Sequence, residues 1–194
     1  MMNLNEFAKE IHTNAVEHGW WDEPRPFDEL CALMISELAE ALEEARAGRP
    51  MEWYWDMERV KDEDNCTTYK KVVTEGFKEG RKPEGIAVEM ADCAIRILDY
   101  LGSKGYPIDE GKFVGDAEIY KDLSYAFMKV CMHIVDAREH NDAGMDEVYE
   151  VWSLEYALCI ILDWFEVNEL DFEAIARCKH EYNKTRPYKH GKEF

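Results

Sequence analysis

The chain has 194 residues, of which 42 are acidic and 23 are basic, so its formal net charge is −19. A surface this acidic repels the phosphates of DNA and RNA, which argues against binding of a duplex nucleic acid. Hydrophobic residues make up 46% of the chain and charged residues 34%, which is typical of a folded globular protein. The length suits a single domain over residues 1–194.

Two further features bear on the compartment. No run of about 18 apolar residues occurs, so we expect no membrane span, and residues 1–6 lack the basic stretch and apolar run of a secretory signal. The six cysteines are scattered and form no Cys-x-x-Cys pair. A disulfide framework is not expected from such spacing, and the sequence therefore predicts a protein of the reducing cytoplasm.

Nearly every periodic segment of the chain is typical of a helix. We expect helices over 5–18, 27–47, 83–101, 116–139, 145–167 and 171–182, with a short one over 108–114. Gly48 is expected to end the second helix, and Pro83 to lie in the first turn of the third. No segment alternates convincingly like a strand, so the predicted fold class is all-α, an antiparallel helical bundle.

Residues 49–82 lack a clear period. We expect them to form a long inserted loop with one short helix near 67–77. A loop of this length inside a compact domain is usually a lid or a binding loop.

The most informative motif is a pair of acids spaced three residues apart, which occurs twice. Glu37 and Glu40 form the first pair, and Glu89 and Asp92 form the second. Each pair lies among apolar residues and shares one face of its helix. Four such acids would repel one another unless a cation lay between them, and ligation by oxygen alone favours Mg²⁺ or Mn²⁺. Arg96 lies on the same stripe as Glu89 and could serve as an internal counter-charge to these acids. The alternative is a network of ion pairs between helices at the rim of the bundle.

A basic tail in this acidic chain supplies a second candidate group. Lys179 and Asn183 lie four residues apart on the last expected helix, and Arg186 follows its end. An ammonium, an amide and a guanidinium on one ledge suit phosphate oxygens. The alternative is a solubilising tail. Trp21, Trp53 and Tyr54 are candidates for stacking on a base, with ordinary packing as the commoner role of such residues.

Three stretches, 35–44, 82–99 and 179–191, together resemble the MazG-like all-α nucleoside triphosphate pyrophosphohydrolases, which include the dimeric dUTPases. The resemblance implies that Glu37, Glu40, Glu89 and Asp92 bind Mg²⁺ and that Lys179, Asn183 and Arg186 bind the substrate phosphates. It also implies cleavage between the α- and β-phosphates, and a homodimer. Ser36 stands where such proteins often carry another Glu, and the gap from Glu40 to Glu89 is longer than in compact members.

Hydrolysis at the α-phosphorus gives a nucleoside monophosphate and pyrophosphate. A bound Mg²⁺ would lower the pKa of the attacking water, and either Glu37 or Glu40 could accept its proton. Such an enzyme would serve in nucleotide-pool housecleaning. Two alternatives stay open: a non-catalytic nucleotide or metal sensor on the same fold, and an acidic helical interaction protein.

The sequence also hints at an internal repeat of residues 27–114 in 120–178. In the second copy Val130 and His133 would stand where Glu37 and Glu40 are, and Ser153 and Tyr156 would replace Glu89 and Asp92. The second half would then be a scaffold without a metal site. The alternative is a coincidence between amphipathic helices.

Overall fold

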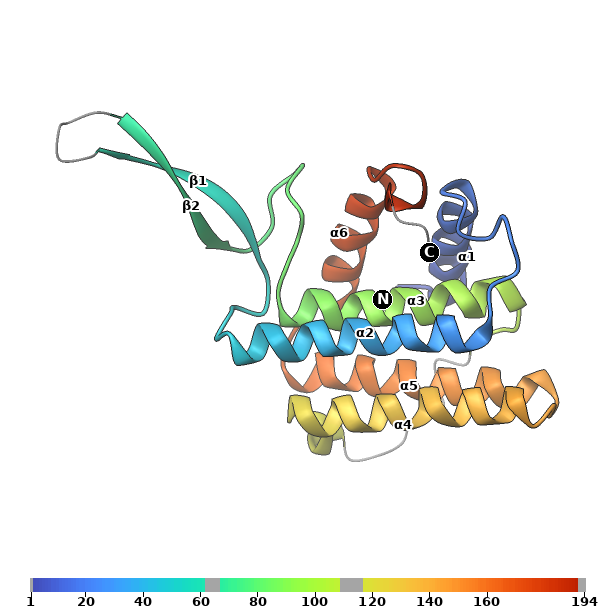
Figure 1. Cartoon of the computed structure of the whole chain (residues 1–194). Coiled ribbons are helices and arrows are strands. Elements are labelled where there is room, and N and C mark those ends of the chain that lie inside the picture. Colours follow the sequence, from blue (N-terminus) through green and yellow to red (C-terminus); the bar gives the residue numbers. More distant parts are fainter. Residues whose placement is uncertain (1, 62–66, 109–116, 192–194) are drawn as a thin grey trace.

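The computed structural model describes residues 2–61, 67–108 and 117–191. The protein is mostly helical with a small two-stranded antiparallel sheet (Figure 1). The α-helices are α1 (Leu4–Glu17), α2 (Phe27–Arg46), α3 (Ile86–Lys104), α4 (Leu123–Asp142), α5 (Glu147–Val167) and α6 (Phe172–Lys184). The strands are β1 (Trp53–Lys61) and β2 (Thr67–Glu75), and two short 3₁₀ helices are η1 (Ala117–Tyr120) and η2 (Tyr188–Gly191). No helix in these ranges is both long and apolar enough to cross a bilayer.

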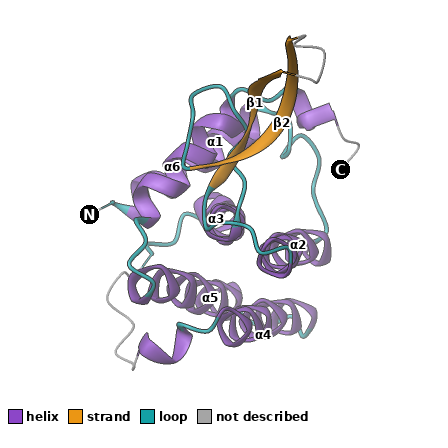
Figure 2. Cartoon of the chain, turned by 90° about the vertical axis from the view of Figure 1, so that its left-hand side faces the viewer, coloured by secondary structure: helices purple, strands orange, loops and turns teal. Residues whose placement is uncertain are grey.

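Helix α3 lies at the centre of the molecule. It packs on α2 and α5 on one side, and α1 and α6 cross its other side (Figure 2). Helix α4 completes the lower layer by packing on α2 and α5. Every residue from 86 to 95 is buried, as expected for a helix covered on all sides. Any charged residue in this part of α3 must therefore find its partners inside the protein.

The expectation of an all-α protein is wrong for residues 49–82. Strands β1 and β2 pair from Trp53 with Glu75 to Lys61 with Thr67, so the short helix expected near 67–77 is a strand. The residues of β2 include three threonines, two valines and a tyrosine, which favour extended backbone. The hairpin extends away from the helices (Figure 1), so much of it faces water on both sides and shows no apolar alternation.

Helix α3 begins three residues later than expected, because a short bridge holds the chain before it. The backbone N–H of Trp53 donates to the carbonyl of Glu84 at 2.8 Å, and the N–H of Glu84 donates to the carbonyl of Trp53 at 2.8 Å. Gly85 then turns the chain at a φ of 120°. Pro83 therefore lies before the helix and not in its first turn.

Helix α4 also begins later than expected. The carboxylate of Asp122 accepts a hydrogen bond from the backbone N–H of Tyr125 at 2.8 Å and caps the helix. The short helix expected over 108–114 falls almost entirely outside the described residues. The internal repeat stays a prediction; at its proposed positions Val130 and Ser153 are buried, and His133 stacks on Tyr156 at 5.5 Å between ring centroids.

Candidate metal centre

Helices α2 and α3 bring three carboxylates together. One oxygen from each of Glu37, Glu89 and Asp92 lies within 4.8 Å of the others. We call these three residues the acid triad. The side chains converge because α2 packs on α3 and because Glu89 and Asp92 share one face of α3. Their residues are only 4%, 2% and 8% exposed, so water contributes little to their solvation.

Two basic side chains lie against the triad. The Arg96 Nε is 2.6 Å from Glu37 Oε1, one turn further along α3 than Asp92. The Lys179 Nζ comes from α6 and lies 3.3 Å from Glu89 Oε2 and 3.2 Å from Asp92 Oδ2. Two cations thus face three carboxylates, and a third positive charge, either a proton or a metal ion, is needed for neutrality.

The pKa values show where that proton would sit. Burial raises the pKa of Glu89 to about 8, and the neighbouring Asp92 and Glu37 add to the effect although Lys179 opposes it. Burial and the charge of Asp92 also raise the pKa of Glu37. Burial acts on Asp92 as well, but Lys179 and Arg96 outweigh it and hold its pKa below the ordinary value. Without metal, Glu89 therefore keeps a proton at neutral pH, and a divalent cation would displace it.

The donor set of the triad fits a hard cation. Carboxylate oxygens are the ligands that Mg²⁺ and Mn²⁺ prefer. Asn183 hydrogen-bonds Asp92, and its Oδ1 is buried without a hydrogen-bond partner among the described residues. This acceptor could take a hydrogen bond from a water on the cation.

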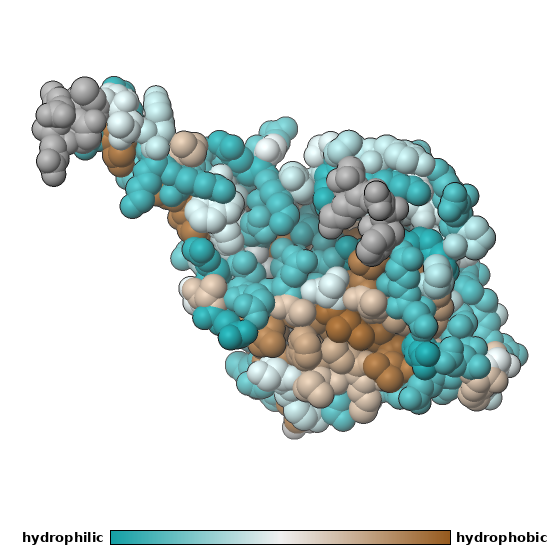
Figure 3. Space-filling view, viewed as in Figure 1, coloured by the Kyte–Doolittle hydropathy of each residue, from teal (hydrophilic) through white to brown (hydrophobic). Residues whose placement is uncertain are grey.

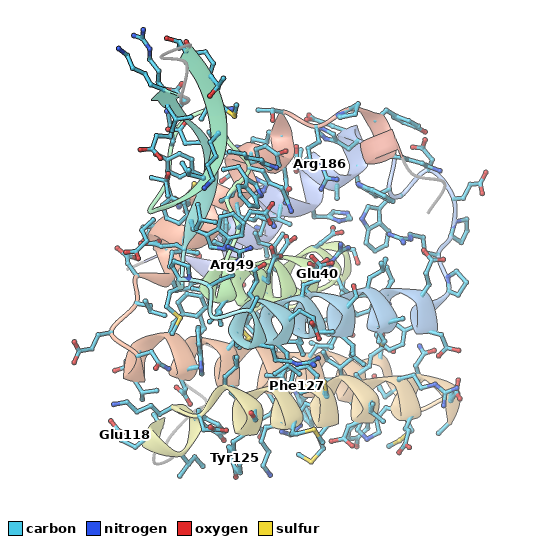
Figure 4. The ribbon with its side chains drawn as sticks, turned by 60° about the vertical axis from the view of Figure 1, so that its left-hand side comes forward. Glu40, Arg49, Glu118, Tyr125, Phe127 and Arg186 are labelled. Carbon is cyan, nitrogen blue, oxygen red and sulfur yellow. The ribbon has the colours of Figure 1, made fainter. Side chains whose placement is uncertain are left out.

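Glu40, the fourth acid of the sequence motif, does not join the triad. It is exposed on α2, one turn beyond Glu37. Figure 4 shows its side chain directed toward the space that lies below Arg186. Its charge contributes to the raised pKa of Glu37, so the two carboxylates are near each other. Three of the four predicted acids are thus buried together, and the fourth faces solvent beside them.

The predicted phosphate-binding residues lie close to these acids but differ from one another. Lys179 is only 3% exposed and is directed to the triad rather than to an open ledge. Asn183 and Arg186 line a cavity between α1, α3 and α6 together with Asp92 and Arg96. The acid and the basic motif therefore meet at one place, although 90 residues separate Glu89 from Lys179.

The opposite wall of this cavity holds residues outside the acid and basic motifs of the sequence. Asn14, Trp20 and Arg25 line it from α1 and the segment that follows. No local pattern marks them, because only the packing of α1 on α3 brings them to the site.

The three candidates for base stacking make internal contacts. The Trp21 Nε1 donates to both carboxylate oxygens of Asp99 at 3.1 Å. Trp53 is 3% exposed and its Nε1 donates to Glu44 Oε2 at 2.6 Å, while Tyr54 is 9% exposed. For Trp53 and Tyr54 the structure thus favours packing at the base of the hairpin over an open stacking face.

Comparisons of the chain with protein-family models, with curated proteins and with solved structures give no match. The resemblance to the MazG-like enzymes accordingly remains an expectation from three stretches of sequence.

Proposed function

We propose that this protein is a Mg²⁺-dependent nucleoside triphosphate pyrophosphohydrolase, which cleaves ribo- or deoxyribonucleotides between the α- and β-phosphates. The observation that carries the proposal is the buried acid triad beside a cavity lined by Arg186 and Arg25. Acids that hold a divalent cation next to guanidinium groups form the charge pattern that a triphosphate requires. Mn²⁺ could replace Mg²⁺ because its preferred ligands are the same.

The residues divide the work as follows. Glu37, Glu89 and Asp92 would hold the cation, which when bound neutralises phosphate charge and acidifies a water molecule. Glu37 is buried and paired with Arg96, whereas Glu40 is exposed, so Glu40 is the better general base. The water oxygen bonds to the α-phosphorus, its proton passes to Glu40, and the bond from the α-phosphorus to the bridging oxygen breaks. Arg186 stabilises the charge that develops on the leaving pyrophosphate.

We also propose an architecture, an oligomeric state and a compartment for the protein. The four helices α2 to α5 would form the antiparallel bundle of the MazG-like enzymes, with the hairpin as an insertion. The protein would act as a homodimer in the cytoplasm and would clear unwanted nucleotides from the pool.

Release of pyrophosphate from a panel of ribo- and deoxyribonucleoside triphosphates in Mg²⁺ tests the proposal. We expect Glu40→Gln and Asp92→Asn each to lower kcat by about 100-fold or more, since a general base alone contributes at least that much. Glu43→Gln is the matched control, because Glu43 lies on the same helix but is exposed and paired with Arg46. Chelation of the metal should abolish the activity and Mg²⁺ should restore it. Full activity in Asp92→Asn, or no turnover of any nucleotide, would contradict the proposal.

One observation favours a second candidate, a non-catalytic nucleotide or metal sensor. The Lys179 ammonium already lies on Glu89 and Asp92, where a cation would bind. Calorimetry that detects Mg²⁺-dependent nucleotide binding without turnover would support the sensor. An acidic interaction protein, the third possibility, predicts no change of Tm when Mg²⁺ and nucleotide are added.

A further inference from the structure

Helices α4 and α5 present a set of large apolar side chains to solvent. We call it the outer face, and each member is at least 41% exposed. Its members are Tyr125, Met128, Met132 and Val135 on α4, and Tyr149, Trp152 and Tyr156 on α5. Figure 4 shows Tyr125 on the side of α4 that is turned away from α2, while Phe127 is turned toward α2. Monomeric proteins rarely expose so many large apolar groups together.

The spacing of these residues is that of a helix–helix seam. On α4 they follow one another after three, four and three residues, and on α5 after three and four. This alternation of three and four residues is the heptad pattern of helices that pack side by side. Helices α4 and α5 already pack on each other, so each contributes one such row of side chains to the outer face. Among the described helices η1 reaches one end of this face, where the ring centroids of Tyr120 and Tyr125 lie 6.0 Å apart.

Helix α5 exposes no charged side chain along this stretch. Between 151 and 161 every residue is buried except Trp152 and Tyr156. A helix without a polar face toward solvent normally lies inside a protein. The aromatic side chains therefore mark a surface built to be covered.

We propose that the outer face is the interface of a homodimer, in which it packs on the same face of a second copy. The exposed parts of its seven side chains amount to roughly 600 Å², which approaches the ~800 Å² per partner of a stable interface. Each copy supplies both α4 and α5, so a twofold axis would pack these two helices on the same two helices of the second copy.

Charge also favours a second copy. No acidic residue occurs between 123 and 135, and the two between 148 and 161, Glu150 and Glu155, are only 3% and 2% exposed. In a chain of net charge −19, this face is poor in carboxylates; Asp136, which pairs with His133, lies at its edge. Figure 3, in the view of Figure 1, shows that apolar surface also gathers over α2 and α4, whereas the upper part of the molecule is hydrophilic.

Sedimentation equilibrium of the purified full chain tests this interface. We expect a dimer, and we expect Trp152→Glu and Met132→Glu each to raise the dissociation constant by about 30-fold or more, as for the loss of a central interface residue. Met57→Glu is the matched control, since Met57 is 50% exposed on β1 and the substitution adds the same charge outside the outer face. Added salt should tighten the wild-type dimer, because it screens repulsion between two acidic molecules.

A wild-type chain that stays monomeric at every concentration would overturn the proposal. It would mean that a different protein covers the outer face. A dimer that survives both substitutions would place the interface elsewhere. Should a variant fail to fold, hydroxyl-radical labelling of the wild type decides the matter. Labelling of Trp152 and Met132 should rise on dilution through the dissociation constant, and unchanged labelling would refute the interface. This inference rests on the homodimer of the proposed function but not on its catalysis, so a monomeric chain that still releases pyrophosphate would refute the interface alone.

Discussion

Lys179 and Arg96 act on the acid triad as built-in counter-ions. Each is itself largely enclosed, so removing either would leave a carboxylate without compensation inside the protein, at a cost of several kcal/mol. Their presence explains how the folded chain tolerates three neighbouring carboxylates before any cation binds. A cation held by the triad would have to displace Lys179, since the ammonium lies on Glu89 Oε2 and Asp92 Oδ2.

The three buried acids could be recognised from sequence, because their spacing and apolar neighbours are local properties. The different burial of Glu37 and Glu40 could not, because it depends on which side of α2 is covered by α3. Likewise, Asp99 accepts a hydrogen bond from His12 Nδ1 at 2.8 Å across 87 residues, and Arg25 reaches the cavity from a loop. Such contacts between distant residues produce no periodic pattern in the sequence.

The raised pKa of Glu89 makes the metal-free protein sensitive to pH. Glu89 titrates near 8 when folded and near its ordinary value of 4.5 when unfolded, so the folded state holds one more proton between these pH values. The free energy of unfolding should therefore fall by up to about 1.4 kcal/mol per pH unit as pH rises through this window, and level off above 8. Urea unfolding in EDTA at several pH values between 5.5 and 9 measures the slope.

Glu89→Gln is the control for this slope. The amide does not titrate, so the variant should lose most of the decline and keep only the smaller part due to Glu37, whose pKa burial also raises. Asp92 contributes nothing in the window because its pKa is lowered. Equal slopes in the wild type and the variant would show that Glu89 is ionised in the folded protein.

The helices could be predicted from the period of their apolar residues and from their caps, whereas the hairpin could not. The apolar side chains of α1 and α2 repeat with the helical period because one side of each faces a core. Strands β1 and β2 pair mainly with each other, and exposed residues such as Tyr69 and Met57 need no alternation. The missed element is thus the one whose partners are backbone groups rather than side chains.

The start of α3 depends on Gly85. A Cβ at this position would lie 2.5 Å from the carbonyl oxygen of Met51, and its φ of 120° is strained for any other residue. We expect Gly85→Ala to lower the free energy of unfolding by about 3 kcal/mol or more, from clash and backbone strain together. Because Glu89 lies in the first turn of α3, Mg²⁺ affinity should fall as well. Chemical denaturation and calorimetric titration of Mg²⁺ measure the two effects.

Gly105→Ala separates the clash from the strain. Gly105 also has a positive φ, 71°, at the other end of α3, but a Cβ there meets nothing within 4 Å. This variant should lose only about 1–2 kcal/mol, with unchanged Mg²⁺ affinity. If the two alanine variants behaved alike, the contact between Met51 and Gly85 would not matter.

At the scale of the whole molecule, polar chemistry and apolar surface lie on opposite sides. The acid triad and its cavity face α1 and α6, above α3 in Figure 1, whereas the outer face of α4 and α5 lies below. Helices α3 and α5 separate them and carry much of the core. A dimer formed through the outer face would therefore leave both cavities open to solvent.

The hairpin arm is the remaining part of the molecule, and its distal half should be dispensable for folding. Trp53 and Tyr54 anchor its base, but an isolated two-stranded ribbon adds little stability of its own. Replacing residues 57–71 by Asn-Gly would join the paired Asp56 and Val72 through a tight turn. We expect the free energy of unfolding to change by no more than about 1 kcal/mol, whereas Trp53→Ala should lose about 3–5 kcal/mol through its buried ring. Urea denaturation compares the two, and a large loss in the shortened chain would mean that the arm stabilises the helical body.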